Sequence, residues 1–210
     1  GGGNRFAKSL AAALEERGDA VVYDLGDPDI DVLFLTDPRS RSSNISFAAG
    51  ACLNYLARRP EAVVIHRINE CDERKGTHSM NWRLRLANYA ADHTVFIASW
   101  LRDLDLWRNG EWSVVLNGGD ETVFRADRNV PWDGREPLKM VTHHWGASLM
   151  KGFDIYQDID RLLGTETWKD RLSFTYVGNL PPGFTFENSR HVAPLDGDAL
   201  AAELASHHVY

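Results

Sequence analysis

One stretch, residues 63–75, places the strongest constraint on how this chain folds. Residues 63–65 are β-branched and apolar, a pattern that predicts a buried strand. From His66 onward, Arg, Asn, Asp, Glu and Lys follow in close succession, and so many polar groups cannot lie in a core. In an open α/β sheet, ligands bind outside the carboxyl ends of the strands. Polar residues that begin where an apolar strand stops therefore predict a functional edge of such a sheet.

Composition narrows the classes of protein to which the chain can belong. Its 210 residues are 43% hydrophobic and 25% charged, which suits one large or two small globular domains. A net charge of −7 argues against nucleic-acid binding driven by bulk charge. The two cysteines, Cys52 and Cys71, have neither the number nor the spacing of a disulfide framework or a zinc site, and a reducing, cytosolic setting fits best. No apolar run is long enough to span a membrane and no signal-peptide pattern is present, so we expect neither spanning nor secretion.

The two ends of the sequence suggest a fragment. The chain opens directly on a glycine-rich loop pattern and closes on residues 208–210, which resemble the beginning of a strand. We expect a further strand before Gly1, at the centre of the first sheet. Without it, residues 21–22 and 63–65 would present unpaired strand edges.

The glycines at the start predict a loop that opens a helix. Apolar residues from Phe6 to Leu14 recur at helical spacing, with Asn4 as the N-cap and Gly18 as the C-cap glycine. Backbone N–H groups of Gly2 and Gly3 would then face an anion, favoured by the helix dipole. Because the full Gly-x-Gly-x-x-Gly spacing is absent, a plain turn remains the alternative.

Strand and helix patterns alternate along the rest of the chain, which favours βαβ units and parallel sheets, and thus the α/β class. A stretch with two prolines and no periodicity, residues 126–138, suits a linker between two such halves. We expect a turn at 117–120 and a loop at 143–146. We also expect Ser99 to cap the helix that follows it. The strands expected are 20–23, 31–36, 62–66, 94–98, 113–116, 139–142 and 172–177, and the longer helices 46–58, 77–91, 152–163 and 198–205.

Several motifs in order carry a resemblance to a known family. They are the glycine loop and its helix, the strand ending in His66, residues 95–101, the turn 117–120 followed by Val123 and Phe124, and residues 151–154. Together they resemble retaining glycosyltransferases of family 4, which have the GT-B fold. The resemblance implies two Rossmann-like domains: an acceptor-side domain at 1–128, a linker at 129–137, and an incomplete donor-side domain at 138–210.

The resemblance implies transfer of a sugar from a nucleoside diphosphate sugar to a hydroxyl of a glycan, a lipid-linked sugar or a small molecule. The nucleotide sugar is a substrate, and no cofactor, metal or nucleic acid is expected. Adjacent His143 and His144 side chains would point to opposite faces of a strand, which argues against a metal. The expected location is the cytoplasm, with peripheral contact at the inner membrane face left open.

The same resemblance assigns roles to individual residues. His66 corresponds to a histidine near the reacting sugar, and Lys151 to the cation that pairs with the donor diphosphate. His144 stands where the family often has arginine, a departure that weakens its match to a phosphate donor. The donor-phosphate set is Gly2, Gly3, Asn4, His144 and Lys151, and the acceptor set is Arg67, Asn69, Glu70, Asp72 and Arg74. The family's acidic segment would lie beyond Tyr210, which puts the activity of this chain alone in doubt.

Two other functions remain open from the sequence. A nucleotide-sugar epimerase can use the same two-domain fold. A non-catalytic module that binds a nucleotide or a sugar, derived from a transferase, would also suit a chain without the acidic segment.

Overall fold

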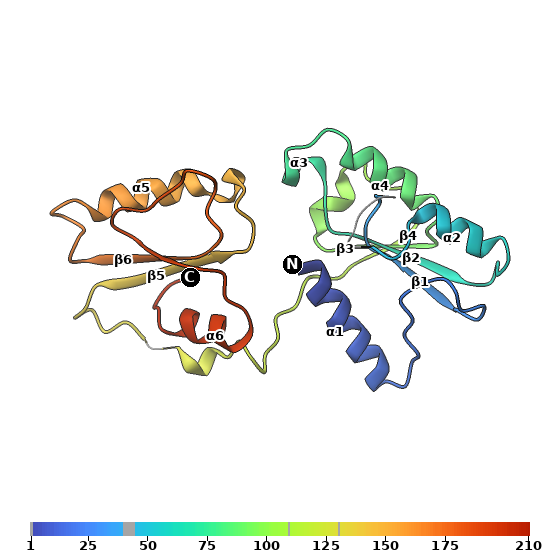
Figure 1. Cartoon of the computed structure of the whole chain (residues 1–210), viewed down its shortest axis with the longest axis horizontal. Helices are drawn as coiled ribbons and strands as arrows, with labels where there is room; N and C mark the ends of the chain where they lie inside the picture. Colours follow the sequence, from blue (N-terminus) through green and yellow to red (C-terminus); the bar gives the residue numbers. More distant parts are fainter. Residues whose placement is uncertain (1, 40–44, 109, 130) are drawn as a thin grey trace. The chain divides into compact units, whose positions relative to one another are not determined.

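The computed structural model describes residues 2–39, 45–108, 110–129 and 131–210. The chain divides into two compact units, Gly1–Gly118 and Gly119–Tyr210. Each unit has its own parallel sheet, so the α/β class and the parallel strands expected from the sequence are confirmed (Figure 1). The division lies closer to the N-terminus than residue 128, because Phe124 packs against a core cluster of the second unit, with Val141 and Leu200.

The first unit is built on a four-stranded sheet with the order β1-β2-β3-β4, and every neighbouring pair is parallel. Its strands are β1 (Val32–Leu35), β2 (Val63–Ile68), β3 (His93–Phe96) and β4 (Glu111–Val114). Its helices are α1 (Gly2–Glu16), α2 (Ala49–Leu56), α3 (Asp72–Lys75), α4 (Met80–Asn88) and the short 3₁₀ helix η1 (Ser99–Asp103).

Helices cover both faces of this sheet (Figure 1). Val64 and Ile68 of β2 belong to the buried clusters under α2 and α4. On the opposite face, Phe6 of α1 meets Phe34 of β1, with ring centroids 6.0 Å apart. Side chains alternate between the two faces along a strand, so His66 shares the face of Val64, and Arg67 shares the face of Phe34.

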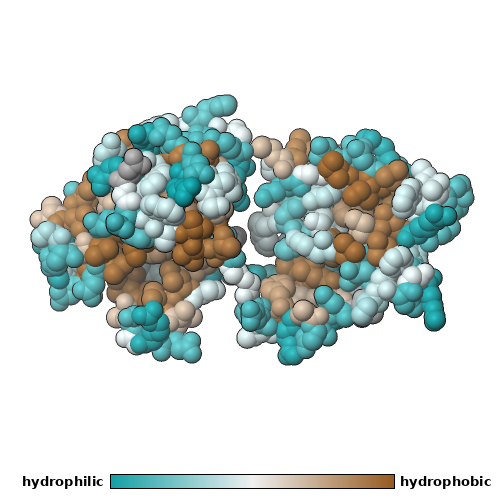
Figure 2. Space-filling view, turned by 180° about the vertical axis from the view of Figure 1, so that it is seen from behind, coloured by the Kyte–Doolittle hydropathy of each residue, from teal (hydrophilic) through white to brown (hydrophobic). Residues whose placement is uncertain are grey.

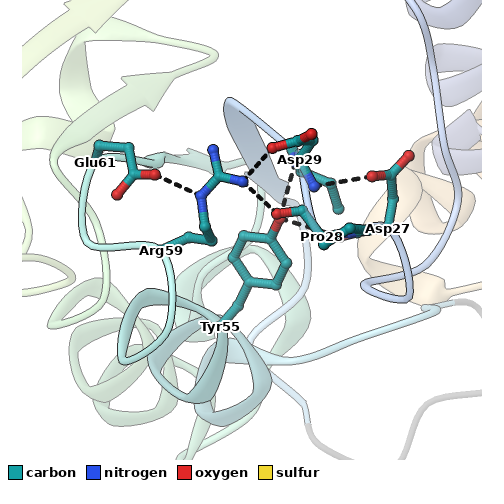
Figure 3. A network of polar contacts seen from close by, with 7 residues as sticks. Asp27, Pro28, Asp29, Tyr55, Arg59 and Glu61 are labelled. Atoms are coloured by element: carbon teal, nitrogen blue, oxygen red, sulfur yellow. Dashed lines mark hydrogen bonds and ion pairs between the residues drawn. The ribbon is translucent and has the colours of Figure 1, made fainter.

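The loop before β1 is tied to helix α2 by a polar network (Figure 3). The hydroxyl of Tyr55 accepts a hydrogen bond from the backbone N–H of Ile30 at 2.8 Å and donates to the carbonyl of Asp27 at 3.0 Å. Arg59 donates to the carbonyl of Pro28 and pairs with Asp29 and Glu61. Tyr55 is only 2% exposed, so its ring fills the core while its hydroxyl holds the chain that leads into β1.

The second unit has a three-stranded parallel sheet with the order β5-β6-β7. Its strands are β5 (Leu138–His144), β6 (Leu172–Gly178) and β7 (Arg190–Val192), and its helices are η2 (Ala126–Arg128), η3 (Leu149–Lys151), α5 (Phe153–Leu163) and α6 (Gly197–Ala205). Val209 forms a parallel bridge to Met140, on the edge of β5 away from β6. Of residues 208–210, which the sequence suggests begin a strand, Val209 alone forms this isolated bridge.

The core of the second unit is largely aromatic. Phe153 of α5 contacts Tyr176 of β6 and Phe184, with ring centroids 5.2 Å and 5.0 Å apart. Asp160, also on α5 and only 6% exposed, accepts hydrogen bonds from three consecutive backbone N–H groups, those of residues 187–189, at 2.7–2.9 Å. This carboxylate therefore fixes the segment between β6 and β7 against α5.

Several local expectations are wrong. Gly2, Gly3 and Asn4 form the first turn of α1 instead of a loop, so Asn4 is not the N-cap, and Gly1 lies outside the described residues. No strand forms at 20–23, because in the described part of the chain no other strand is there to pair with its backbone groups, and Val22 and Tyr23 are exposed.

Three further boundaries differ from expectation. Ser99 lies inside η1, which follows Ala98 and has no side-chain cap. β2 continues two residues past His66, and β5 includes His143 and His144, which the sequence placed in a loop. By contrast, Gly18 has φ 92° just after α1, as expected of a C-cap glycine.

Candidate functional site

Arg67 is the most unusual charged residue at the carboxyl end of β2. Its side chain is buried, with 5% exposed, between the sheet and α1, and burial lowers the pKa of its guanidinium group. The guanidinium stacks over the ring of Phe6 and donates one hydrogen bond to Asn117 Oδ1 at 2.7 Å. No carboxylate pairs with it among the described residues. A buried cation without a counter-ion favours an anionic ligand group at this edge.

The contact with Phe6 also places the N-terminal half of α1 at the same edge. Gly2–Asn4 occupy the helical turn before Phe6, so their backbone N–H groups belong to the positive end of the helix. The structure thus brings α1 and Arg67 together, although it turns the expected glycine loop into helix.

His66 is fully buried, on the face of the sheet opposite Arg67. Asn88 fixes its tautomer: the backbone N–H of Arg108 donates to Asn88 Oδ1, so Asn88 Nδ2 donates to His66 Nδ1 at 3.0 Å and to Thr94 Oγ1 at 2.9 Å. With Nδ1 as an acceptor, the neutral ring carries its proton on Nε2. This Nε2 is buried without a partner in the described part of the molecule, and burial lowers the pKa of His66 to about 4.

The remaining residues of the acceptor set have mostly local partners. Asp72 accepts hydrogen bonds from the backbone N–H groups of Met80 and Asn81 at 2.8 Å and 3.0 Å, so it caps α4. Arg74 donates to the carbonyl oxygen of Asn69 at 2.9 Å. The side chains of Asn69 and Glu70 are half-buried beside the end of β2.

Three residues at this edge were not assigned to the site by the sequence analysis. Asp37 and Arg39 follow β1 and pair with each other, and Asn117 follows β4. The hydrogen bonds to Asp37 raise the pKa of Arg39, and the charge of Glu70 acts in the same direction, so Glu70 lies near this pair. The sequence could have indicated these residues, because each one follows the carboxyl end of a predicted strand.

The carboxyl edge of the second sheet is organised around His144. Its Nδ1–H donates to the carbonyl of Gly146 at 2.8 Å, which leaves Nε2 as an acceptor that is buried without a partner in the described part of the chain. The ring packs between Phe153 and Tyr176. Asn179 donates to the carbonyl of Trp145 at 2.7 Å, so the end of β6 holds the loop that leaves β5.

Lys151 ends η3, and the left-handed Gly152, with φ 87°, turns the chain into α5. The ammonium group is exposed and has no carboxylate partner among the described residues. Burial lowers the pKa of His144, and the charge of Lys151 lowers it further, against the hydrogen bond to Gly146. The His144 ring packs against Phe153, the first residue of α5, and Lys151 lies two residues before Phe153, so a cation, a helix N-terminus and His144 lie at the same edge of the sheet, a combination that suits a phosphate.

No group of three His, Cys, Asp or Glu side chains that could hold a metal ion occurs among the residues described. No helix in the described ranges has both the length and the apolar character needed to cross a bilayer. No protein-family model and no curated protein sequence matches this chain.

Proposed function

We propose that this chain acts in retaining glycosyl transfer, with the nucleoside diphosphate sugar bound by the second unit and the acceptor hydroxyl bound by the first. Two parallel α/β units with polar groups at their carboxyl edges support this proposal. A GT-B arrangement of the two units is part of the proposal.

The observation that carries it is Lys151 just before α5, exposed and without a carboxylate partner among the described residues. A donor diphosphate would accept hydrogen bonds from the ammonium group and from the first backbone N–H groups of α5. When the bond between the sugar and the diphosphate breaks, negative charge grows on the leaving phosphate. Lys151 offsets this charge and stabilises the transition state more than the ground state.

At the first unit, Arg67 would bind the acceptor side of the reaction. The acceptor oxygen forms the new bond on the face of the sugar that the leaving group vacates. Its proton passes to the departing phosphate oxygen, so no external base is required. The Nε2–H of His66 would donate to a sugar hydroxyl once the residues that cover the ring move aside.

The direct test is release of nucleoside diphosphate from a panel of nucleotide sugars, with and without simple sugar acceptors, followed by chromatography. We expect release by the wild-type chain and a loss in Lys151→Ala. Lys169→Ala is the matched control, because it removes the same charge from an exposed lysine that already pairs with Glu166. Equal turnover by all three proteins would contradict the proposed role of Lys151.

A second candidate function is a module that binds a nucleotide or sugar without catalysis. Full burial of His66 favours it, since the residue assigned to the reacting sugar is not accessible. Binding of a nucleoside diphosphate that depends on Lys151, without any turnover of nucleotide sugars, would support the module over the transferase.

A further inference from the structure

The second unit has a hollow at the amino ends of its strands, on the face of the sheet that α6 covers (Figure 1). Leu200 and Leu204 of α6 pack over the carboxyl half of this face, against Val141, Val177 and Val192. The hollow, of about 410 Å³, lies over the amino half, where α6 has ended. The polar residues that line it include Lys139, Ser173, Thr175, Arg190, Ser206 and His207.

The polar lining sets this hollow apart from the rest of the surface. Apolar residues reach the surface of both units (Figure 2), so an apolar patch alone does not single out a binding site in this chain. In the hollow, two cations, three hydroxyl groups and an imidazole converge, in a space that suits a small metabolite. None of the described residues that line it is acidic. Lys151 and His144 lie at the opposite ends of the strands, so the hollow is separate from the proposed donor site.

Lys139 and Arg190 stand on opposite sides of the hollow. Strand β6 runs between β5 and β7, so these two residues are two strands apart, with Cα atoms separated by about 10–12 Å. Lys139 pairs with Glu136, and Arg190 pairs with Glu203. Both cations are partly exposed, and ion pairs at a surface contribute little to stability. Each cation can therefore exchange its carboxylate for that of a ligand at small cost.

Hydroxyl groups on the middle strand lie between the two cations. Ser173 and Thr175 share the face of Val177, because side chains alternate along β6. The Nδ1–H of His207 donates to the carbonyl of Glu203 at 2.7 Å, so Nε2 of the neutral ring accepts the Thr175 hydroxyl at 2.9 Å. The oxygen of Thr175 keeps lone pairs that can accept a hydrogen bond from a ligand. The hydroxyl of Ser173 has no hydrogen-bond partner among the described residues.

We propose that this hollow binds a small dicarboxylate that carries a hydroxyl group. One carboxylate would pair with Lys139 and the other with Arg190, while the ligand hydroxyl bonds to Ser173 and Thr175. Arg190 already donates to both oxygens of Glu203, the geometry in which a guanidinium group binds a carboxylate best. Two cations on opposite sides favour a ligand with two separated charges over a single compact anion. This inference does not depend on the proposed glycosyl transfer.

Calorimetric titration of malate, succinate and acetate into the 210-residue chain tests the proposal. We expect malate to bind most tightly. Succinate lacks the hydroxyl group and should bind about fivefold more weakly. Acetate has a single carboxylate, so it should bind at least about tenfold more weakly than succinate.

Variants locate the binding groups. Arg190→Gln should weaken malate binding at least about tenfold, and Ser173→Ala about fivefold. Ser173 is exposed, so Ser173→Ala provides an independent variant if Arg190→Gln does not fold. Arg161→Gln is the matched control, because it removes an exposed guanidinium group that pairs with Asp158 on α5. Arg161→Gln and Lys151→Ala should both bind malate as wild type does.

Nuclear magnetic resonance gives a second measurement of the site. Malate should shift the backbone amide signals of Ser173, Arg190 and Ser206, and leave that of Lys151 unchanged. The proposal is overturned if malate does not bind, if acetate binds as tightly as malate, or if Arg190→Gln and Ser173→Ala bind malate as wild type does. Loss of malate binding in Lys151→Ala, with full binding in Arg190→Gln, would place the dicarboxylate at the carboxyl edge instead.

Discussion

The guanidinium group of Arg67 lies over the ring of Phe6, with Cζ 3.8 Å from the ring centroid. The contact joins a strand of the first sheet to the first half of α1 and keeps a positive charge at the carboxyl edge of β2. It offsets only part of the desolvation of a side chain that is 5% exposed and has no carboxylate partner among the described residues. We therefore interpret Arg67 as a residue retained for binding at some expense of stability.

Replacing Arg67 by methionine separates binding from stability. Methionine keeps the length of the buried side chain and removes its charge, so we expect a free energy of unfolding within about 1 kcal/mol of wild type, or higher. Inorganic phosphate should raise the melting temperature of the wild-type chain more than that of Arg67→Met, because the variant keeps only the phosphate site proposed at Lys151. Arg17→Met, at an exposed site, should respond to phosphate as wild type does. A loss of several kcal/mol in Arg67→Met would instead identify the guanidinium as a structural group.

Lys151→Ala tests the donor site quantitatively. The change removes a charge-assisted contact worth about 1.5–3 kcal/mol, so affinity for a nucleoside diphosphate should fall roughly 10- to 100-fold. Calorimetric titration of uridine, guanosine and adenosine diphosphates into both proteins measures the loss. Lys169→Ala should bind as wild type does. Equal affinities for Lys151→Ala and wild type would mean that Lys151 is an ordinary solvated lysine and that the phosphate lies elsewhere.

Asp160 should contribute stability that depends on pH. Burial raises the pKa of its carboxyl group, but the hydrogen bonds from residues 187–189 outweigh burial and the pKa is lowered. A group with a lowered folded pKa stabilises the protein above its unfolded pKa, and the contribution is lost as pH falls through the folded pKa. Asp160→Asn should destabilise the chain by about 2–4 kcal/mol at neutral pH, and by less in acid.

Urea unfolding followed by circular dichroism, at a series of pH values, measures the effect of Asp160→Asn. Asp158→Asn is a matched control on the same helix, because Asp158 is exposed and pairs only with Arg161 among the described residues. It should change stability little. A deficit in Asp160→Asn that stays constant into acid would contradict the expected pH dependence.

His66 should destabilise the folded chain in mild acid. Burial lowers its folded pKa to about 4, below the unfolded value of about 6.5. The unfolded chain therefore binds a proton first, and stability is lost as pH falls from the unfolded pKa toward the folded one, by on the order of 3 kcal/mol. Between neutral pH and pH near 4, the melting temperature of wild type should fall more steeply than that of His66→Leu. Parallel pH profiles for the two proteins would show that His66 is hydrated and titrates normally.

The elements with a clear periodic pattern could be predicted from the sequence. Helix α5 begins one residue from its expected start, because Gly152 and the apolar face from Phe153 to Leu163 both mark it. β6 ends within one residue of its expected end, since Leu172, Phe174 and Tyr176 alternate with small polar residues ahead of Gly178. Residues 20–23 have the composition of a strand, but local composition carries no information about whether a partner lies beside them.

The site was harder to predict, because convergence at a sheet edge is a tertiary property. The sequence analysis placed the acceptor set beyond the end of β2. In the structure the strand continues to the buried Ile68, so His66 and Arg67 lie within the strand, on opposite faces. The sequence could not show that α1 would cover one face and α4 the other, which buries both residues. Asp37, Arg39 and Asn117 are distant in sequence, and only the parallel order of β1 to β4 brings them to the edge where Arg67 lies.

The end of β6 allows no side chain at all. Gly178 has φ 147°, and a Cβ atom there would lie 2.1 Å from the carbonyl oxygen of His144, a backbone atom that cannot move without parting the two strands. If variants of this chain are selected for a folded second unit, position 178 should therefore retain glycine even where neighbouring positions accept other residues. The requirement for glycine at position 178 comes from backbone geometry and is independent of which ligand the edge binds.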